Sequence, residues 1–148
     1  MENSLTMDRP KLKPKQRTLD RIFDIILGIG TMVLILMPLY YYQDLPKEIP
    51  MHFDASGEVD SYSGRNSIWF LSMIGVVVVA GLRWLREYPQ IYNYPVKITN
   101  KNAEIQYLLA QRMIVITAIF IAFLFSIIQY VVITAAISSD EVANVSII

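Results

Sequence analysis

Three long stretches without charge constrain the fold more than any other feature of this sequence. Residues 25–41, 67–82 and 113–137 contain no Asp, Glu, Lys or Arg and consist mostly of aliphatic and aromatic side chains. A helix needs about 20 predominantly apolar residues to cross the hydrocarbon core of a bilayer, with a range of roughly 17–25. A chain of 148 residues is too small to bury three all-round apolar helices in a soluble core. The sequence therefore predicts an all-α integral membrane protein with spans at 22–42, 67–85 and 113–137.

Composition supports this interpretation and narrows the chemistry. Hydrophobic residues make up 54% and charged residues 18% of the chain, against roughly 45–50% and about 25% in soluble proteins. The absence of cysteine excludes disulfides, thiolate metal sites and iron–sulfur clusters. The sequence contains no recognisable nucleophile–base pair, phosphate loop or paired-carboxylate site. We therefore expect no enzymatic activity, no catalytic residue and no cofactor.

The charged residues divide between the two sides of the predicted membrane domain, residues 22–137. The arm 1–21 and the loop 86–112, together with Arg83, hold eleven of the 13 basic residues, whereas the loop 43–66 and the tail 138–148 hold mostly acids. The positive-inside rule then places the N-terminus and the loop 86–112 in the cytoplasm and the C-terminus outside. We expect the basic arm to be disordered or to lie on anionic lipid, so the bilayer and not nucleic acid is its expected partner.

The outer loop combines an extended segment with a turn. Two prolines, Pro46 and Pro50, favour extended backbone. Alternation places Ile49, Met51 and Phe53 on one face, and such an apolar face suggests docking onto the helix ends. Residues 54–57 carry turn chemistry, with Asp first and Gly last.

The same loop carries a family resemblance. Residues 45–53 read Leu-Pro-x-x-Ile-Pro-x-His-Phe, Gly-x-x-Asp follows at 57–60, and a base precedes an aromatic-led span. This pattern resembles the N-terminal domain of SdpI-like immunity proteins, a bacterial membrane domain of unknown function (number 1648). Arg65 stands where that family usually has Lys. The larger proteins carry a second membrane half, so the resemblance is to small, three-span members.

The resemblance implies a multi-pass protein of the bacterial cytoplasmic (inner) membrane with a role in tolerance to a secreted toxic peptide. The implied partners are an extracytoplasmic peptide ligand and a cytoplasmic regulator. The outer-loop binding candidates are Pro46, Pro50, His52, Phe53, Asp54, Gly57, Asp60 and Arg65. The cytoplasmic candidates are Asn93, Tyr94, Pro95, Thr99, Asn102, Gln106, Tyr107 and Arg112.

His52 is the one histidine in the sequence, with Asp54 and Asp60 nearby. It could fix the loop through a side-chain hydrogen bond, contact a ligand or partner, or bind a divalent metal. No spacing here is diagnostic of a metal site. We favour the first alternative and assign no metal ligands.

Asp24 lies near the cytoplasmic edge of the first span. Acids inside membranes are often functional, so a proton or ion relay is one alternative. The other is a structural ion pair close to the start of the helix. We favour the second and predict contact with Arg112 or Arg83.

The third span carries small residues at four-residue steps, Ala118, Ala122 and Ser126, and Gln129 lies on the same face. Small residues let helices approach closely, so we expect Gln129 to hydrogen-bond across helices. The glycines at 28, 30, 75 and 81 are further packing candidates, and a homodimer is plausible. A transport or ion-handling subunit working as an oligomer is the alternative function. Asp24, Gln129 and Pro38 would carry it, and a polar path through the oligomer would distinguish it.

The segment before the third span has the features of a helix start. Thr99 is a candidate N-cap whose side-chain oxygen would accept from the amide of Asn102. An apolar stripe follows at helical spacing, formed by Ile105, Leu108, Leu109 and Met113. We therefore expect the last helix to begin near Asn100 and to run unbroken into the membrane, with this stripe on headgroups or on a partner.

Overall fold

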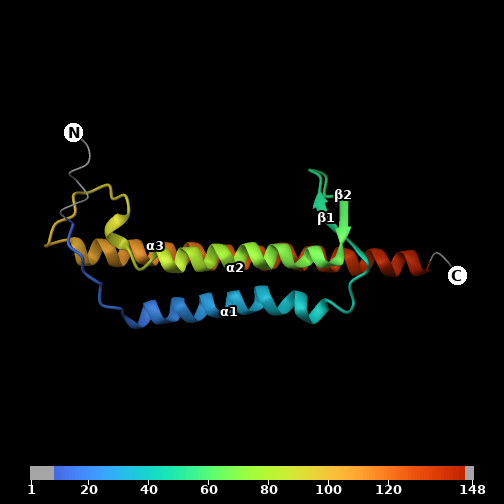
Figure 1. Cartoon of the computed structure of the whole chain (residues 1–148), viewed down its shortest axis with the longest axis horizontal. Coiled ribbons are helices and arrows are strands. Elements are labelled where there is room, and N and C mark those ends of the chain that lie inside the picture. Colours follow the sequence, from blue (N-terminus) through green and yellow to red (C-terminus); the bar gives the residue numbers. More distant parts are fainter. Residues whose placement is uncertain (1–8, 146–148) are drawn as a thin grey trace.

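Three helices lie along one another and make up most of the computed structural model (Figure 1). The structure describes residues 9–145, with side chains described from 9 to 138. The helices are α1 (Thr18–Tyr41), α2 (Ile68–Leu85) and α3 (Ala103–Val145). In Figure 1, α1 and α3 run in one direction and α2 in the other. All three are long and apolar enough to cross a membrane, as predicted.

The helices extend beyond the predicted spans in two of the three cases. α2 begins at Ile68, one residue after the start of its predicted span, whereas α1 begins at Thr18, before the start of its predicted span. α3 contains 43 residues and is about 64 Å long at 1.5 Å per residue, roughly twice the hydrocarbon thickness of a bilayer. The predicted tail 138–148 is therefore helical up to Val145, while residues 146–148 and the side chains of Asp140 and Glu141 lie outside the described part.

α3 is the central helix, because it packs extensively against both α1 and α2. Two of its small residues, Ala118 and Ala122, are fully buried in a cluster with Leu27 of α1 and Val79 of α2. Small side chains let helix backbones approach closely, which is the main source of packing energy between helices in lipid. The predicted small-residue face of the third span is confirmed.

The glycines divide into two groups. A Cβ atom built on Gly75 would lie 2.5 Å from Leu34 Cδ2 and 2.9 Å from Phe125 Cδ2, so this glycine allows α2 to approach both other helices. Gly30 faces Ala122 and Phe123 at van der Waals distance or slightly less. For Gly28 and Gly81 the packing prediction is wrong, since nothing lies within 4 Å of a built Cβ.

A β-hairpin, which the all-α prediction did not include, connects α1 to α2. Strands β1 (Glu48–Phe53) and β2 (Val59–Gly64) pair antiparallel, and a 3₁₀ turn at Arg65–Ser67 leads into α2. In Figure 1 the hairpin projects from the bundle on the side away from α1. Pro50 is tolerated in β1 because a two-stranded sheet consists entirely of edge strands. The second strand was not predicted because β2 lacks the apolar alternation that usually marks a strand.

The hairpin docks on the helix ends through its first strand. Ile49 is fully buried in a cluster with Leu45, Ile133 and Ala136, and Phe53 packs at its edge. The prediction for Met51 is wrong, because its side chain is 37% exposed. The register shifts on both sides of His52, and such a bulge breaks the alternation of faces along a strand.

Residues 9–17 (the arm) pack against the loop 86–102, which includes a 3₁₀ turn at Pro89–Ile91. Arg9 Nη1 donates to the carbonyl oxygens of Gln90 and Tyr92, at 3.1 and 2.6 Å. Leu12 contacts a buried cluster of Ile98, Ala103 and Tyr107. The expectation of a disordered arm is therefore wrong for residues 9–17, whereas contact of the arm with anionic lipid stays a prediction; residues 1–8 lie outside the described part. We call this end of the bundle the arm end and the opposite one the hairpin end.

Candidate functional site

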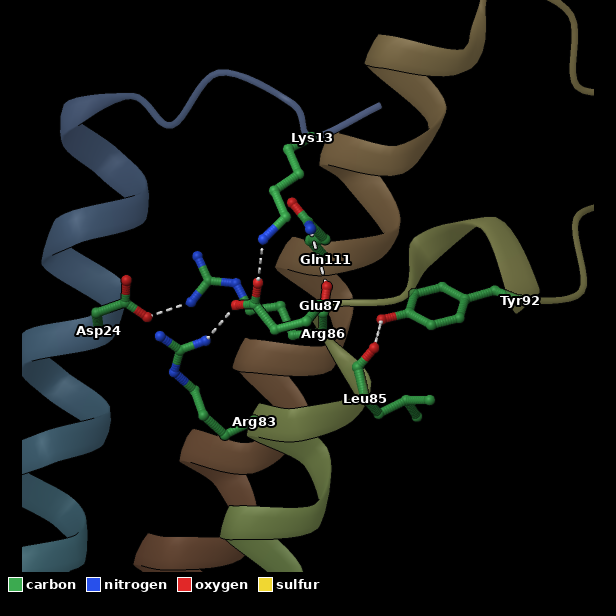
Figure 2. A network of polar contacts seen from close by, with 8 residues as sticks. All are labelled: Lys13, Asp24, Arg83, Leu85, Arg86, Glu87, Tyr92 and Gln111. Atoms are coloured by element: carbon green, nitrogen blue, oxygen red, sulfur yellow. Dashed lines mark hydrogen bonds and ion pairs between the residues drawn. The ribbon is translucent and has the colours of Figure 1, made fainter. Parts of the chain in front are cut away.

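At the arm end, Asp24 of α1 forms an ion pair with Arg86, which follows the last residue of α2 (Figure 2). The Arg86 side chain is only 5% exposed. The predicted partners of Asp24, Arg112 and Arg83, are wrong. Arg83 instead pairs with Glu87 one turn along, at 3.0 Å, and Arg112 binds a different carboxylate.

That second carboxylate is Asp20, one helical turn before Asp24. Arg112 Nε of α3 lies 2.7 Å from Asp20 Oδ1, and the Asp20 side chain is 2% exposed. Asp20 Oδ2 also accepts from the backbone amide of Arg17 at 2.7 Å, so it caps the start of α1. Residues four apart lie on one face of a helix. α1 thus presents two acids; one binds an arginine of α3 and the other an arginine just after α2.

Further polar contacts surround the Asp24–Arg86 pair (Figure 2). Gln111 Nε2 of α3 donates to the carbonyl oxygen of Arg86 at 2.8 Å. Glu87 accepts from Lys13 of the arm at 3.2 Å, and this hydrogen bond, with a second from Arg83, lowers the Glu87 pKa. Each of the three helices and the arm therefore contributes side chains to one connected polar junction.

Two tyrosines extend the junction into the loop. Tyr92 Oη donates to the Leu85 carbonyl at 2.7 Å, and burial raises the Tyr92 pKa to about 12. Tyr94 Oη donates to the Pro89 carbonyl at 2.9 Å, and its ring lies 5.7 Å from that of Tyr107. Burial raises the pKa of Tyr94 as well. The two hydroxyls therefore stay protonated at neutral pH. Each tyrosine packs through its ring and donates one hydrogen bond through its hydroxyl.

The remaining predicted residues of this segment have mixed positions. Tyr107 is fully buried, whereas Asn93 and Pro95 are exposed and Gln106 is half-buried. The predicted cap at Thr99 is wrong in direction, because the Thr99 amide and hydroxyl both donate to Asn102 Oδ1, at 2.7 and 3.2 Å. Asn102 Nδ2 also donates to the Lys97 carbonyl at 3.0 Å, so this side chain fixes the turn through both its oxygen and its nitrogen.

Between the two ends, Gln129 of α3 contacts Ser72 of α2. Ser72 Oγ lies 3.0 Å from Gln129 Oε1 and 2.8 Å from the Leu34 carbonyl oxygen of α1. The predicted hydrogen bond of Gln129 across helices is confirmed. Gln129 is fully buried, and its Nε2 has no partner among the described residues.

At the hairpin end, His52 Nδ1 lies 2.6 Å from Asp60 Oδ1 across the two strands, and both side chains are exposed. This contact agrees with the loop-fixing alternative for His52. Among the described residues, no group of three or more His, Cys, Asp and Glu could hold a metal ion.

The turn between the strands is organised by Asp54. Its Oδ1 accepts from the Ser56 amide and hydroxyl and from the Glu58 amide at 2.6–2.9 Å, which lowers the Asp54 pKa. Gly57 has φ +86°, a conformation that favours glycine. The predicted turn at 54–57 is confirmed, and it holds the exposed tip in one conformation.

The base of the hairpin is fixed by Arg65. Its guanidinium carbon lies 5.2 Å from the centre of the Tyr42 ring, and its amide donates to the Lys47 carbonyl at 2.9 Å. The Tyr42 hydroxyl also hydrogen-bonds to Asn66. Pro46 is half-buried and Pro50 is buried, so both belong to the docked base and not to the exposed tip.

Sequence reasoning did not single out several residues of these sites. They are Asp20, Arg86, Gln111, Tyr42 and Ser72. The spacing of Asp20 and Asp24 was a usable signal, because two acids four residues apart on a helix face two bases on neighbouring helices. Gln111 and Ser72 carried no comparable signal.

Comparisons with known proteins find a family resemblance but leave the activity open. A family model described as a domain of unknown function (DUF1648) matches residues 29–76, from the middle of α1 through the hairpin into α2. The chain is similar to an uncharacterized protein of Archaeoglobus fulgidus, with 32% identity over 75 residues. That alignment covers 45% of this chain and 41% of the relative, so the chain spans about two fifths of the relative's length. No solved structure matches the chain. The predicted resemblance to the DUF1648 domain is confirmed.

Proposed function

We propose that this multi-pass membrane protein is a non-enzymatic interaction protein of the immunity type, and that its hairpin contacts a secreted toxic peptide. The observation that carries the proposal is the construction of the hairpin. Its base is fixed by the buried Ile49 and by Arg65, while nearly every residue of β2 and of the turn is exposed. A rigid, exposed polar element needs no ordering when it binds, which favours recognition.

The charge of the hairpin defines the class of ligand. The segment 43–66 carries five acids against Lys47 and Arg65. Two of the acids, Asp54 and Asp60, are engaged in the turn and with His52, whereas the side chains of Glu48 and Glu58 are exposed and form no ion pair among the described residues. Complementary charge speeds association and selects partners. The proposed ligand is therefore a cationic peptide.

This role requires the hairpin to face outward and the arm to face the cytoplasm. The basic residues at the arm end support that orientation through the positive-inside rule. Because the chain contains no cysteine, single cysteines can report on it. In intact cells, a membrane-impermeant maleimide should label Ser61→Cys in β2 and should leave Lys11→Cys in the arm unlabelled. The reverse pattern would rule out the proposed orientation.

The function itself is tested by deletion and challenge. Cells lacking the protein are exposed to a panel of membrane-active cationic peptides, and sensitivity is compared after return of the wild-type chain, of Glu58→Gln or of the control Glu104→Gln. We expect the deletion to sensitise cells to at least one peptide, with Glu58→Gln restoring less protection than Glu104→Gln. Unchanged sensitivity across the panel would contradict the immunity proposal.

A transport or ion-handling subunit is the second candidate, and the Gln129–Ser72 contact favours it. Burying an amide whose N–H group has no hydrogen-bond partner in the middle of a span costs free energy. Polar groups kept in a membrane at such a cost often have a function. Proteoliposomes with an ion-sensitive dye separate the two candidates. A flux that disappears in Gln129→Leu would support transport, whereas no flux from the wild-type chain would leave interaction as the function.

A further inference from the structure

An open cleft of about 810 Å³ lies at the arm end. The end of the arm and the start of α1 line one side of it, and the start of α3 lines the other. Four basic side chains line it: Lys15, Arg17 and Arg21 from the first segment and Lys101 from the turn before α3. The two segments are at least 80 residues apart in the sequence. The fold, and not a local basic run, therefore brings these four charges to one cavity.

These four bases differ from the four bases of the polar junction at the same end. Lys13, Arg83, Arg86 and Arg112 each pair with a carboxylate. Among the described residues, none of the four cleft bases forms an ion pair, and one acid, Glu104, lines the cleft with them. Like charges gathered around one cavity repel each other, and an anion in the cavity relieves that repulsion.

The cleft also has an apolar wall. Ile105 and Leu108 of α3 line it beside the bases. One helical turn further into the bundle, Ile22 of α1 and Leu109 of α3 are 46% and 48% exposed. Residues four apart share a helix face, so apolar surface continues from the cleft toward the membrane spans on both helices.

We propose that this cleft binds the phosphate headgroup of an anionic phospholipid, with the acyl chains lying over the exposed apolar residues of α1 and α3. The bases supply charge-assisted hydrogen bonds to phosphate oxygens. Basic pockets at the ends of membrane helices suit such headgroups. The site is separate from the hairpin, so its test is independent of the proposed immunity function.

Native mass spectrometry of the full chain in detergent tests the proposal. The chain is titrated with phosphatidylglycerol or with phosphatidylcholine, and the bound fraction is measured for wild type, Arg21→Gln/Lys101→Gln and the control Lys11→Gln/Lys97→Gln. Both variants remove two exposed bases from the same end, and circular dichroism checks equal helix content. We expect wild type and control to retain phosphatidylglycerol over phosphatidylcholine. The cleft variant should bind it about 30-fold more weakly, from the contribution that each base near an anionic headgroup makes.

A second experiment distinguishes a lipid ligand from soluble phosphate. Inorganic phosphate is added as a competitor, and thermal stability is measured with phosphate alone. If only the lipid is retained, the headgroup is the ligand; stabilisation by phosphate that depends on Arg21 and Lys101 assigns the same chemistry to a soluble anion. Equal lipid binding by the two double variants, or no preference for phosphatidylglycerol, would overturn the proposal.

Discussion

The two ends of the bundle use charged residues in opposite ways. At the arm end, Asp20 and Asp24 are paired with Arg112 and Arg86, and two of these four side chains are nearly inaccessible. At the hairpin end the pair His52–Asp60 lies in the open, as does most of the turn. Burying a charge is unfavourable unless it is paired. The arm end thus uses charge to join helices, whereas the hairpin end displays charge on a small, fixed platform.

The largest effect is expected from Arg86→Met at the arm end. The substitution leaves Asp24 without its partner. Breaking a fully buried pair on one side destabilises a protein by about 3–5 kcal/mol, and the loss here is expected at the lower end of that range because the Asp24 side chain is 31% exposed. Unfolding of the detergent-solubilised chain by SDS, followed by circular dichroism, measures the change. The control is Arg83→Met, whose exposed pair with Glu87 contributes only about 0.3–0.5 kcal/mol. Equal losses of stability in the two variants would contradict the distinction between a buried and an exposed ion pair.

Ile49→Ala should undock the hairpin without breaking the bundle. Truncating a fully buried isoleucine costs about 2–5 kcal/mol, and here the loss falls on the contact between β1 and α3. Limited proteolysis within 43–66 should accelerate strongly, while the helix content stays constant. Met51→Ala is the matched control because its side chain is partly exposed. A hairpin that stays protected in Ile49→Ala would mean that the strands, and not the docked face, hold it.

Gly57→Ala should loosen the tip of the hairpin alone. A side chain at φ +86° costs roughly 1–2 kcal/mol, which is enough to shift the turn but not the base. Gly64→Ala is the control, since Gly64 has no positive φ and has open space around it. Amide hydrogen exchange at residues 54–59 should rise in Gly57→Ala only.

Acid should release the arm, with the smallest effect of the four. The Glu87 pKa is lowered in the folded protein from its ordinary value of 4.5. Its contribution is therefore fully present at pH above 4.5 and is lost as the pH falls through the lowered pKa. Both partners are largely exposed, so the effect is small. Maleimide labelling of Leu12→Cys in detergent should rise at acidic pH relative to a fully exposed reference cysteine, and Glu87→Gln should remove that dependence.

Sequence patterning predicted the three membrane helices because an uncharged run of this length has few alternatives in water or lipid. It also predicted the turn at Asp54–Gly57 and the contact of Gln129 across helices, since both depend on local chemistry or on one helix face. The fold of β2 was not predictable in this way, because Val59–Gly64 is mostly polar and lacks the apolar alternation that would mark its pairing with β1.

The ion-pair partners show the other limit of sequence reasoning. Asp24 was correctly expected to bind an arginine, but three arginines lie near its level, and rotation of each helix decides among them. Arg86 is selected because it follows the last turn of α2 with its side chain directed at α1, while Arg83 stays beside Glu87. Such rotations depend on close contacts such as the one at Gly75, which no single sequence pattern specifies.

The length of α3 has a mechanical consequence. This helix contains neither glycine nor proline from Ala103 to Val145, so it lacks the two residue types at which helices most often bend sharply. Near one end it carries Tyr107 of the arm-end cluster, and further along it carries Ile133 of the hairpin-end cluster. A stiff rod that twists or slides at one end moves at the other. The hairpin and the arm are therefore attached to one continuous helix, and no loop interrupts it between the two clusters on which they dock.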